Sequence, residues 1–262
     1  MRHEFERVHL TIHGKVAVLT LNHPEVLNAT SAAMLKGAHK ALKLALTQKV
    51  RALVLTGEGR GFCSGANLSE GVADGLEGFR PGDLLRDAYH PFLLALRDVP
   101  LPVVCAVNGV AAGIGMSIAL SADLVVAARS AFFSQAFAQI GLVPDGGSTW
   151  LLPRLIGLAR ARELSLLAER LPAETALEWG LINRVFDDDR LMPEAIALAG
   201  RLADGPSSLA GIRRLYRQSP HNSYEQQLAA ELDAQDEAAA SADFAEGLAA
   251  FRAKRPPHFK GS

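Results

Sequence analysis

Two segments of the chain share one design, in which a short apolar run leads directly into a turn of small residues and then a helix. In the first, Leu53–Thr56 precedes Gly61-Phe-Cys-Ser-Gly-Ala-Asn67, and in the second, Val103–Val107 precedes Asn108-Gly-Val-Ala-Ala-Gly-Ile-Gly-Met116. Short apolar runs that end at glycine-rich turns are typical of buried strands. Strands that alternate with helices predict an α/β fold with a parallel sheet, because parallel neighbours need a crossover connection.

The alternation continues on both sides of these segments and then stops. Further strands are expected at 16–21, 50–56 and 123–128, and helices at 31–46, capped by Thr30 or Ser31, and at 84–96. From about residue 154 the pattern is helical, at 159–168, 173–178, 192–202 and 224–251, with one strong strand at 182–186. We therefore divide the chain into an α/β core, residues 1–195, and a helical C-terminal region, residues 196–262.

The two glycine turns have a chemical as well as a structural interpretation. A helix N-terminus presents unpaired N–H groups, and glycine lets a ligand approach the backbone closely. Two such turns side by side would form an oxyanion hole. Taken singly, either turn could equally serve close packing of strand and helix. The second turn is not a dinucleotide fingerprint, because Ile118 stands where the last glycine is needed, and neither turn carries a Walker A lysine.

A third segment, Ile140-Gly-Leu-Val-Pro-Asp-Gly-Gly-Ser-Thr-Trp150, places Asp145 between a proline and two glycines in apolar surroundings. One interpretation is an N-cap or an Asx-turn ahead of a helix that starts near Ser148 or Thr149. The other is a partly desolvated carboxylate with a raised pKa, which suits the transfer of a proton. The segment alone leaves both open.

Composition excludes several other functions. With 27 basic and 28 acidic side chains in 262 residues, the net charge of −1 gives no field that would attract nucleic acid or an anionic membrane. Cys63 and Cys105 form no CxxC pair, so we expect neither a zinc site nor a disulfide. The charged N-terminus is unlike a signal peptide, and polar residues interrupt the apolar stretch 101–127, so we expect a cytoplasmic protein without a membrane span. The glycine-rich residues 69–82 predict a mobile loop.

Together these segments resemble the enoyl-CoA hydratase/isomerase (crotonase) superfamily over nearly the whole chain. The resemblance also rests on Leu19-Thr-Leu-Asn-His-Pro-Glu-Val-Leu-Asn28, Ala176-Leu-Glu-Trp-Gly-Leu-Ile-Asn-Arg-Val185 and Glu246-Gly-Leu-Ala-Ala-Phe-Arg-Ala-Lys-Arg255. It implies a spiral of ββα turns, of the kind shared by crotonase and ClpP, with a C-terminal region for trimerisation, and a homotrimer or hexamer that binds an acyl-CoA thioester. In this family the two oxyanion amides would be those of Ala66 and Ile114.

The chain departs from the hydratases of that family at three positions. Ser117 and Phe137 occupy the places of the two glutamates that activate water, beside Gly113 in the expected substrate pocket. Asp145 occupies a place that is often glycine in hydratases. It is a working aspartate in dienoyl-CoA isomerases, in phenylacetate-pathway ring-epoxide isomerases and in 4-chlorobenzoyl-CoA dehalogenases. The run 141–155 is most similar to that of the ring-epoxide isomerases, whereas His90 matches a histidine base of the dehalogenases.

The resemblance implies isomerisation by proton transfer through Asp145, without a metal or redox cofactor and with CoA as part of the substrate. The alternatives are a hydratase with other carboxylates, a dehalogenase-like enzyme that uses Asp145 and His90, and a non-catalytic acyl-CoA binder. By family correspondence, the CoA contacts are Val26, Leu27, Arg60, Ser64, Leu68 and Lys260, the last possibly in a neighbouring subunit.

Overall fold

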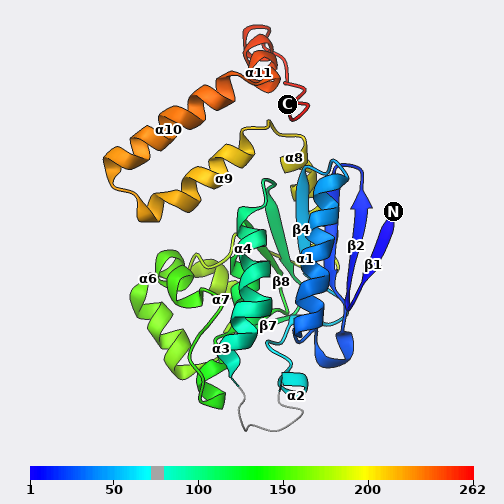
Figure 1. Cartoon of the computed structure of the whole chain (residues 1–262), viewed down its shortest axis with the longest axis vertical. Helices are drawn as coiled ribbons and strands as arrows, with labels where there is room; N and C mark the ends of the chain where they lie inside the picture. The colour runs from blue at the N-terminus through cyan, green and yellow to red at the C-terminus, as the bar shows by residue number, and fades with distance from the viewer. Residues whose placement is uncertain (72–79) are drawn as a thin grey trace.

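The computed structural model describes residues 1–71 and 80–262, which form two β-sheets with helices around them and a helical lobe at the C-terminal end (Figure 1). The larger sheet has the order β1-β2-β3-β4-β6-β8-β11 and the smaller one β10-β9-β7-β5. The larger sheet contains β1 (Arg2–Phe5), β2 (Val8–His13), β3 (Val16–Leu21), β4 (Ala52–Gly57), β6 (Val103–Val107), β8 (Leu124–Ala128) and β11 (Arg184–Phe186). The smaller one contains β5 (Gly61–Cys63), β7 (Val110–Ala112), β9 (Phe132–Ser134) and β10 (Leu171–Pro172).

Successive strand pairs build a spiral that runs through both sheets. β4, β6 and β8 are parallel neighbours in the larger sheet, and each is followed in the chain by β5, β7 or β9, which are parallel neighbours in the smaller one. After β7 the chain enters α5 (Ile114–Leu120), and the connection after β5 includes α2 (Leu68–Gly71), α3 (Pro81–Leu84) and α4 (His90–Asp98). This winding agrees with the expected ββα turns, and it stacks the ends of β5 and β7 side by side.

The core lies along the central strands of the larger sheet. β3, β4 and β6 are buried at every position, which explains their uninterrupted apolar sequences. α1 (Ala32–Thr47) packs on β1, β2 and β3, and α8 (Leu191–Ala203) packs on β3, β4, β6 and β8. The predicted division between residues 195 and 196 therefore falls inside α8, a helix that still belongs to the packing of the sheet.

The helices beyond α8 form a lobe that extends away from the sheets (Figure 1). It contains α9 (Leu209–Gln218), α10 (Tyr224–Ala239) and α11 (Ala242–Arg252). The largely buried side chain of Arg213 on α9 reaches the Asp123 carboxylate, with Nε–O distances of 2.6 and 2.7 Å, and also donates to the Val99 carbonyl. One ion pair thus fastens the start of the lobe to the start of β8.

Most predicted elements are present, and the differences have local causes. The strand at 16–21 and the helix capped by Ser31 are confirmed, and the helix at 84–96 is part of a continuous helical segment, 81–98, with a π-helical turn at Leu85–Tyr89. The single helix predicted at 224–251 is wrong, because Ser241 caps a new helix by accepting a hydrogen bond from the Phe244 amide. β1, β2, α9 and the four strands of the smaller sheet, β5, β7, β9 and β10, were not predicted.

The remaining helices differ from the prediction mainly at their ends. α6 (Ser148–Leu167) begins at Ser148, one of the two starts considered for the helix after Asp145, and it includes most of the helix expected at 159–168, with a bend at Gly157. α7 (Ala173–Glu178) matches the prediction. The short helical turns are Pro24–Val26, Ala136–Ile140 and Ser219–His221. The mobile loop expected at 69–82 lies largely outside the described residues.

Candidate active site

The two glycine turns meet at the ends of β5 and β7. A Cβ added to Gly65 would lie 3.4 Å from the Ala112 carbonyl oxygen, and one added to Gly113 would lie 3.9 Å from the Gly65 Cα atom. Both residues have positive φ, +114° at Gly65 and +52° at Gly113, which favours glycine. Parallel pairing of the strands thus places the amides that follow, at Ala66 and Ile114, on neighbouring turns.

Neither of these amides has an acceptor among residues 1–71 and 80–262. Ile114 is the first residue of α5, where the helix cannot supply a partner for the N–H group. The carbonyl of Gly113, in the same peptide group, accepts hydrogen bonds from the amides of Met116 and Ser117, at 3.1 and 3.3 Å. Two adjacent unpaired donors are what an oxyanion hole requires.

The turn that carries Asp145 packs directly against α5. A Cβ on Gly146 would lie only 2.7 Å from Ser117 Cβ and would also overlap Ile114, so this position has room only for hydrogen. Ser117 Oγ donates to the Asp145 carbonyl at 3.0 Å. These contacts hold Asp145 beside the residue whose amide starts α5, although the two segments are about thirty positions apart in sequence.

The Asp145 carboxyl group is half buried, and its Oδ1 atom is buried with no hydrogen-bond partner in the described part of the chain. Burial without a compensating partner raises its pKa to about 6. The predicted N-cap role is wrong, since Gly147 holds the cap position of α6 without a side-chain bond. A carboxyl group with this pKa can gain and lose a proton near neutral pH.

Ser117 and Phe137 supply no carboxylate to this place. Ser117 is fully buried, and its hydroxyl group donates to backbone carbonyls. Phe137 is 6% exposed, and its ring lies 3.7 Å from where a Cβ of Gly113 would be. The structure therefore brings together Ala66, Gly113, Ile114, Ser117, Phe137 and Asp145 as one site with an apolar wall.

Known proteins have sequences similar to that of this chain. Residues 11–262 match the family model described as enoyl-CoA hydratase/isomerase. The chain belongs to this family. A protein named as a probable enoyl-CoA hydratase from Rhodobacter capsulatus is 46% identical over 98% of this chain and 99% of its own length. The 1,2-epoxyphenylacetyl-CoA isomerase of Escherichia coli K12 is also 46% identical, over 94% of this chain and 95% of its own length.

A solved structure confirms that this family member has the crotonase fold predicted from its motifs. The enoyl-CoA hydratase from Polaromonas sp. JS666 superimposes with a TM-score of 0.90 at 35% identity, over 97% of this chain and 99% of that one. The expected family and fold are both correct, and the protein is an enzyme of the crotonase superfamily.

Five of the six residues expected to bind CoA lie close to the start and end of β5. The Ser64 amide donates to the Leu27 carbonyl at 3.0 Å, and Ser64 Oγ donates to the Val26 carbonyl at 3.0 Å. Arg60 and Leu68 are exposed on the segments that precede and follow this strand. Residues 26–27 and 60–68 thus form one continuous edge beside the glycine turns.

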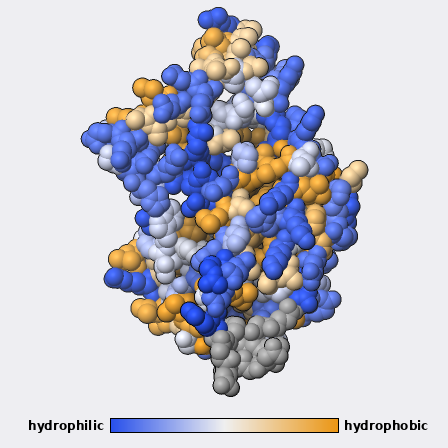
Figure 2. Space-filling model, viewed as in Figure 1, coloured by the Kyte–Doolittle hydropathy of each residue, from blue (hydrophilic) through white to orange (hydrophobic). Residues whose placement is uncertain are grey.

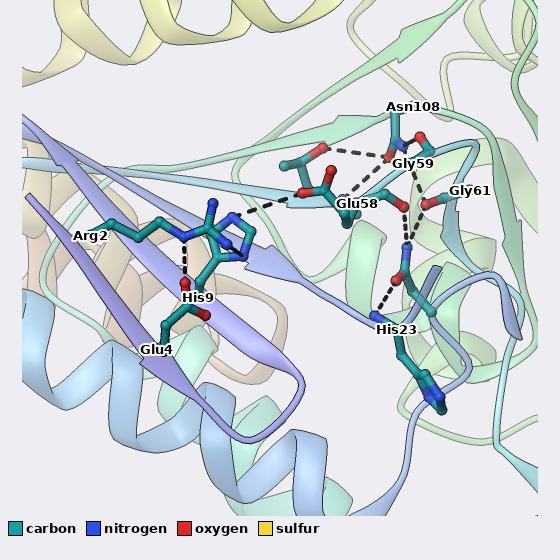
Figure 3. A network of polar contacts seen from close by, with 11 residues as sticks. Arg2, Glu4, His9, His23, Glu58, Gly59, Gly61 and Asn108 are labelled. Carbon is teal, nitrogen blue, oxygen red and sulfur yellow. Dashed lines mark hydrogen bonds and ion pairs between the residues drawn. The ribbon is translucent and has the colours of Figure 1, made fainter. Parts of the chain in front are cut away.

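Two asparagines hold the loop that carries Arg60, and Figure 3 labels one of them, Asn108, beside Gly59 and Gly61. Asn28 Nδ2 donates to the carbonyls of Glu58 and Gly61, at 2.9 and 2.7 Å, and its Oδ1 accepts from the His23 amide. Asn108 Nδ2 donates to the Gly59 carbonyl at 2.8 Å. Both asparagines come from the recognised motifs, which suggests that these motifs serve to shape this loop.

Lys260 is not part of this edge within one chain. Its amide donates to Asp243 on α11 at 2.7 Å, and the preceding Phe259 carbonyl accepts from Arg51 at the start of β4. The CoA-side residues follow the opposite end of that strand, and Figure 1 shows the C-terminus and α2 at opposite ends of the molecule. Within one chain, Lys260 therefore lies away from the edge that residues 26–27 and 60–68 form.

The helical segment 81–98 presents a residue that the motifs did not indicate. His90 is exposed, whereas the adjacent Tyr89 is 2% exposed and its Oη atom lies 3.0 Å from Thr30 Oγ1. Burial is the main cause that raises the pKa of Tyr89 to about 12, and the charge of Asp145 adds to it. Tyr89 and Thr30 are 59 positions apart, so local sequence patterns could not have paired them.

Three further observations concern metal-ligating side chains, the cysteines and membrane-spanning helices. Among the described residues, no group of three His, Cys, Asp or Glu side chains is placed to hold a metal ion. Cys63 and Cys105 are free and buried, and burial raises the pKa of Cys63 to about 12. No helix in the described ranges is long and apolar enough to cross a membrane.

Proposed function

We propose that this family member is an acyl-CoA isomerase that shifts a double bond, or rearranges a ring epoxide, in an enoyl- or aryl-acetyl-CoA. The observation that carries the proposal is the half-buried Asp145, with an unpartnered Oδ1 and a pKa of about 6, packed against α5 where the two glycine turns meet. Ser117 and Phe137 leave that place without the two glutamates that hydratases of the family use to activate water.

In the proposed reaction the thioester carbonyl oxygen accepts hydrogen bonds from the Ala66 and Ile114 amides. These donors stabilise the enolate that forms when a carbon-bound proton is removed. The Asp145 carboxylate takes that proton and, as the electron pair moves along the conjugated system, returns it to another carbon. The net change is a shift of bonds with no gain or loss of atoms. CoA is the carrier part of the substrate, and the step needs no metal or redox cofactor.

The relatives support isomerisation and hydration to a similar degree by identity alone, since one of the two at 46% is named a hydratase and the other an epoxide isomerase. The residues favour the isomerase. A hydratase needs a group that activates water in addition to the oxyanion donors, whereas one carboxylate suffices to relay a proton. His90 is exposed, and in the described part of the chain no hydrogen bond or ion pair joins it to Asp145, so we give a dehalogenase-like reaction second place.

We also propose that the protein works as a homotrimer or a pair of trimers. The lobe of α9–α11 carries large exposed apolar side chains, which include Tyr216, Leu232 and Phe251 at 77%, 62% and 82% exposure. On the face drawn in Figure 2, hydrophobic residues lie among hydrophilic ones over this lobe. Such a surface is typical of a protein–protein interface. Light scattering coupled to size-exclusion chromatography tests this, and a monomer at micromolar concentration would contradict it.

A panel of CoA thioesters in heavy-oxygen water tests the proposed reaction. The panel contains crotonyl-CoA, a dienoyl-CoA, an aromatic ring-epoxide CoA and a halobenzoyl-CoA. The masses of the products are measured by mass spectrometry. We expect an isomerised product without heavy oxygen and only weak hydration of crotonyl-CoA. Efficient incorporation of heavy oxygen would show hydration or dehalogenation and would contradict the isomerase assignment.

A further inference from the structure

The peptide group between Gly65 and Ala66 is held from its carbonyl side by one residue from the segment before α1. Thr30, which is 1% exposed, donates to the Gly65 carbonyl twice, through its amide at 2.7 Å and through its hydroxyl group at 3.1 Å. The Thr30 carbonyl in turn accepts from the Asn67 amide at 2.8 Å. Thr30 therefore bonds to the residue on each side of Ala66 but leaves the Ala66 amide itself unused.

Tyr89 fixes the Thr30 side chain from behind. The phenol Oη lies 3.0 Å from Thr30 Oγ1 and 3.1 Å from the Thr30 carbonyl oxygen. Each hydroxyl group has a single proton. The Tyr89 hydroxyl donates to the Thr30 carbonyl, and either hydroxyl group can donate in the contact between Oη and Oγ1. Tyr89 thus holds in place the threonine whose hydroxyl group donates to the Gly65 carbonyl.

The planarity of the peptide bond links this chain of hydrogen bonds to the proposed oxyanion hole. The Gly65 carbonyl and the Ala66 N–H belong to one trans peptide group, so they point in opposite directions in a single plane. Fixing the carbonyl toward Thr30 aims the N–H away from it, out of the turn. Hydrogen bonds accepted by the carbonyl also polarise the peptide group, which strengthens its N–H as a donor.

We propose that Thr30 and Tyr89 are positioning residues that orient and polarise the Ala66 amide for the developing enolate oxygen. This inference deepens the proposed function and rests on it. The Thr30 amide alone satisfies the bridge to Gly65, so the two hydroxyl groups are additional to what the fold requires at this point. Their role is in the rate of the chemical step, with little effect on acyl-CoA binding.

Substitutions that remove only hydroxyl groups test this role. Thr30→Val keeps the backbone bridge and side-chain shape, Tyr89→Phe keeps the buried ring, and Thr30→Ser restores the hydroxyl. Thr56→Val is the matched control, because Thr56 is another buried threonine whose Oγ1 donates to a backbone carbonyl, that of Ala106, at 2.9 Å. Folding is checked for each variant by circular dichroism and by oligomer size.

The rates should separate the two hydroxyl groups from the control. For the best substrate of the panel, we expect kcat to fall about 3–10-fold in Thr30→Val and Tyr89→Phe, as for one neutral hydrogen bond, with KM within about twofold. The double variant should lose much less than the product of the two single losses, since the groups act in series. Thr30→Ser and Thr56→Val should keep kcat within about twofold.

A spectroscopic measurement reports on the donor itself. Raman difference spectra of bound hexa-2,4-dienoyl-CoA, labelled with ¹³C at the thioester carbon, give the carbonyl stretching frequency. Hydrogen bonds lower that frequency in the wild type, and we expect a smaller lowering in Thr30→Val and Tyr89→Phe but not in Thr56→Val. A purely structural role would lower thermal stability without changing this frequency.

The outcomes distinguish this inference from the proposed function. Unchanged kcat and carbonyl frequency in either folded variant, or an increase in KM alone, contradicts the inference and leaves the isomerase assignment intact. A wild-type carbonyl with no lowering at all contradicts the oxyanion hole, and with it both proposals. Thr30→Val and Tyr89→Phe each decide the question independently, so loss of folding in one leaves the other decisive.

Discussion

The two glycine turns and the Asp145 turn pack against one another, yet they contribute different parts of their residues. At Ala66 and Ile114 the functional group is the backbone amide, held by strand pairing and by the start of α5. At Asp145 it is the side chain, which has lost water and gained no partner for Oδ1. Activity should therefore depend on the N–H groups of Ala66 and Ile114 more than on their side chains, whereas the Asp145 turn should tolerate no change of the carboxylate.

Among the substitutions that test this comparison, Asp145→Asn should lower turnover the most. The amide has nearly the shape of the carboxyl group but cannot carry the proton, so we expect turnover to fall about 10²–10⁴-fold, the usual contribution of a general acid-base. Acyl-CoA binding, measured by calorimetry, should be retained. Turnover at the wild-type rate on any accepted substrate would show that Asp145 transfers no proton.

Ile114→Pro removes a backbone donor and should come next. Proline lacks the N–H group, and the first turn of a helix tolerates it, so the fold should be retained. Loss of one oxyanion donor typically lowers the rate about 10²–10³-fold. Ile114→Val is the control, because it keeps the amide and most of a side chain that is 1% exposed.

Near-normal activity in a folded Ile114→Pro protein would mean that the second glycine turn is structural only. Circular dichroism and oligomer size must match the wild type before the rates are compared. The Ile114→Val control should lose only a small part of the activity, and a loss as large as that of proline would locate the effect in the side chain.

The pH dependence should follow the Asp145 side chain and not the amides, which do not titrate. Because burial raises the pKa of this carboxyl group to about 6, a base in that position becomes protonated below that pH. We expect kcat/KM to fall about tenfold per pH unit below about pH 6, since this ratio reports on the free enzyme. A profile that stays flat down to pH 4.5 would exclude Asp145 as the base.

The same burial predicts a smaller effect on stability. The folded state holds the Asp145 proton more tightly than the unfolded chain, whose pKa is near 3.8, so stability decreases as pH rises from about 4 to about 6. Above that range Asp145→Asn should melt at a higher temperature than the wild type, by about 2 °C or more, and the gap should close near pH 4. A lower melting temperature at pH 8 would indicate that Asp145 has a partner in solution.

Removal of metal should have no effect at all if both kinds of turn act through protein groups only. After dialysis against EDTA, we expect the rate to stay within experimental error of the untreated enzyme. Loss of activity that magnesium or zinc restores would show that the enolate is stabilised by an ion in addition to, or instead of, the two amides.

The sequence alone was sufficient for the family, for most helices and for five strands of the larger sheet, β3, β4, β6, β8 and β11. These features depend on short-range patterns, such as the buried run 103–107 or the small residues that follow it. Such patterns can be recognised within the few residues of a single strand or turn. The break at Ser241 and the two N-terminal strands were missed because their signals are short, although β2 alternates apolar and polar residues. Strand β1 alternates exposed and half-buried residues and is set by its pairing with β2.

The tertiary structure decided which groups meet and what their surroundings do to them. Gly65 and Gly113 become neighbours only because β5 and β7 pair, and the pKa of Asp145 rises only because α5 and its neighbours exclude water from it. The contact of Tyr89 with Thr30 joins residues 59 positions apart. Burial and hydrogen bonding of this kind depend on the packing of distant segments, so no local pattern in the sequence could have predicted them.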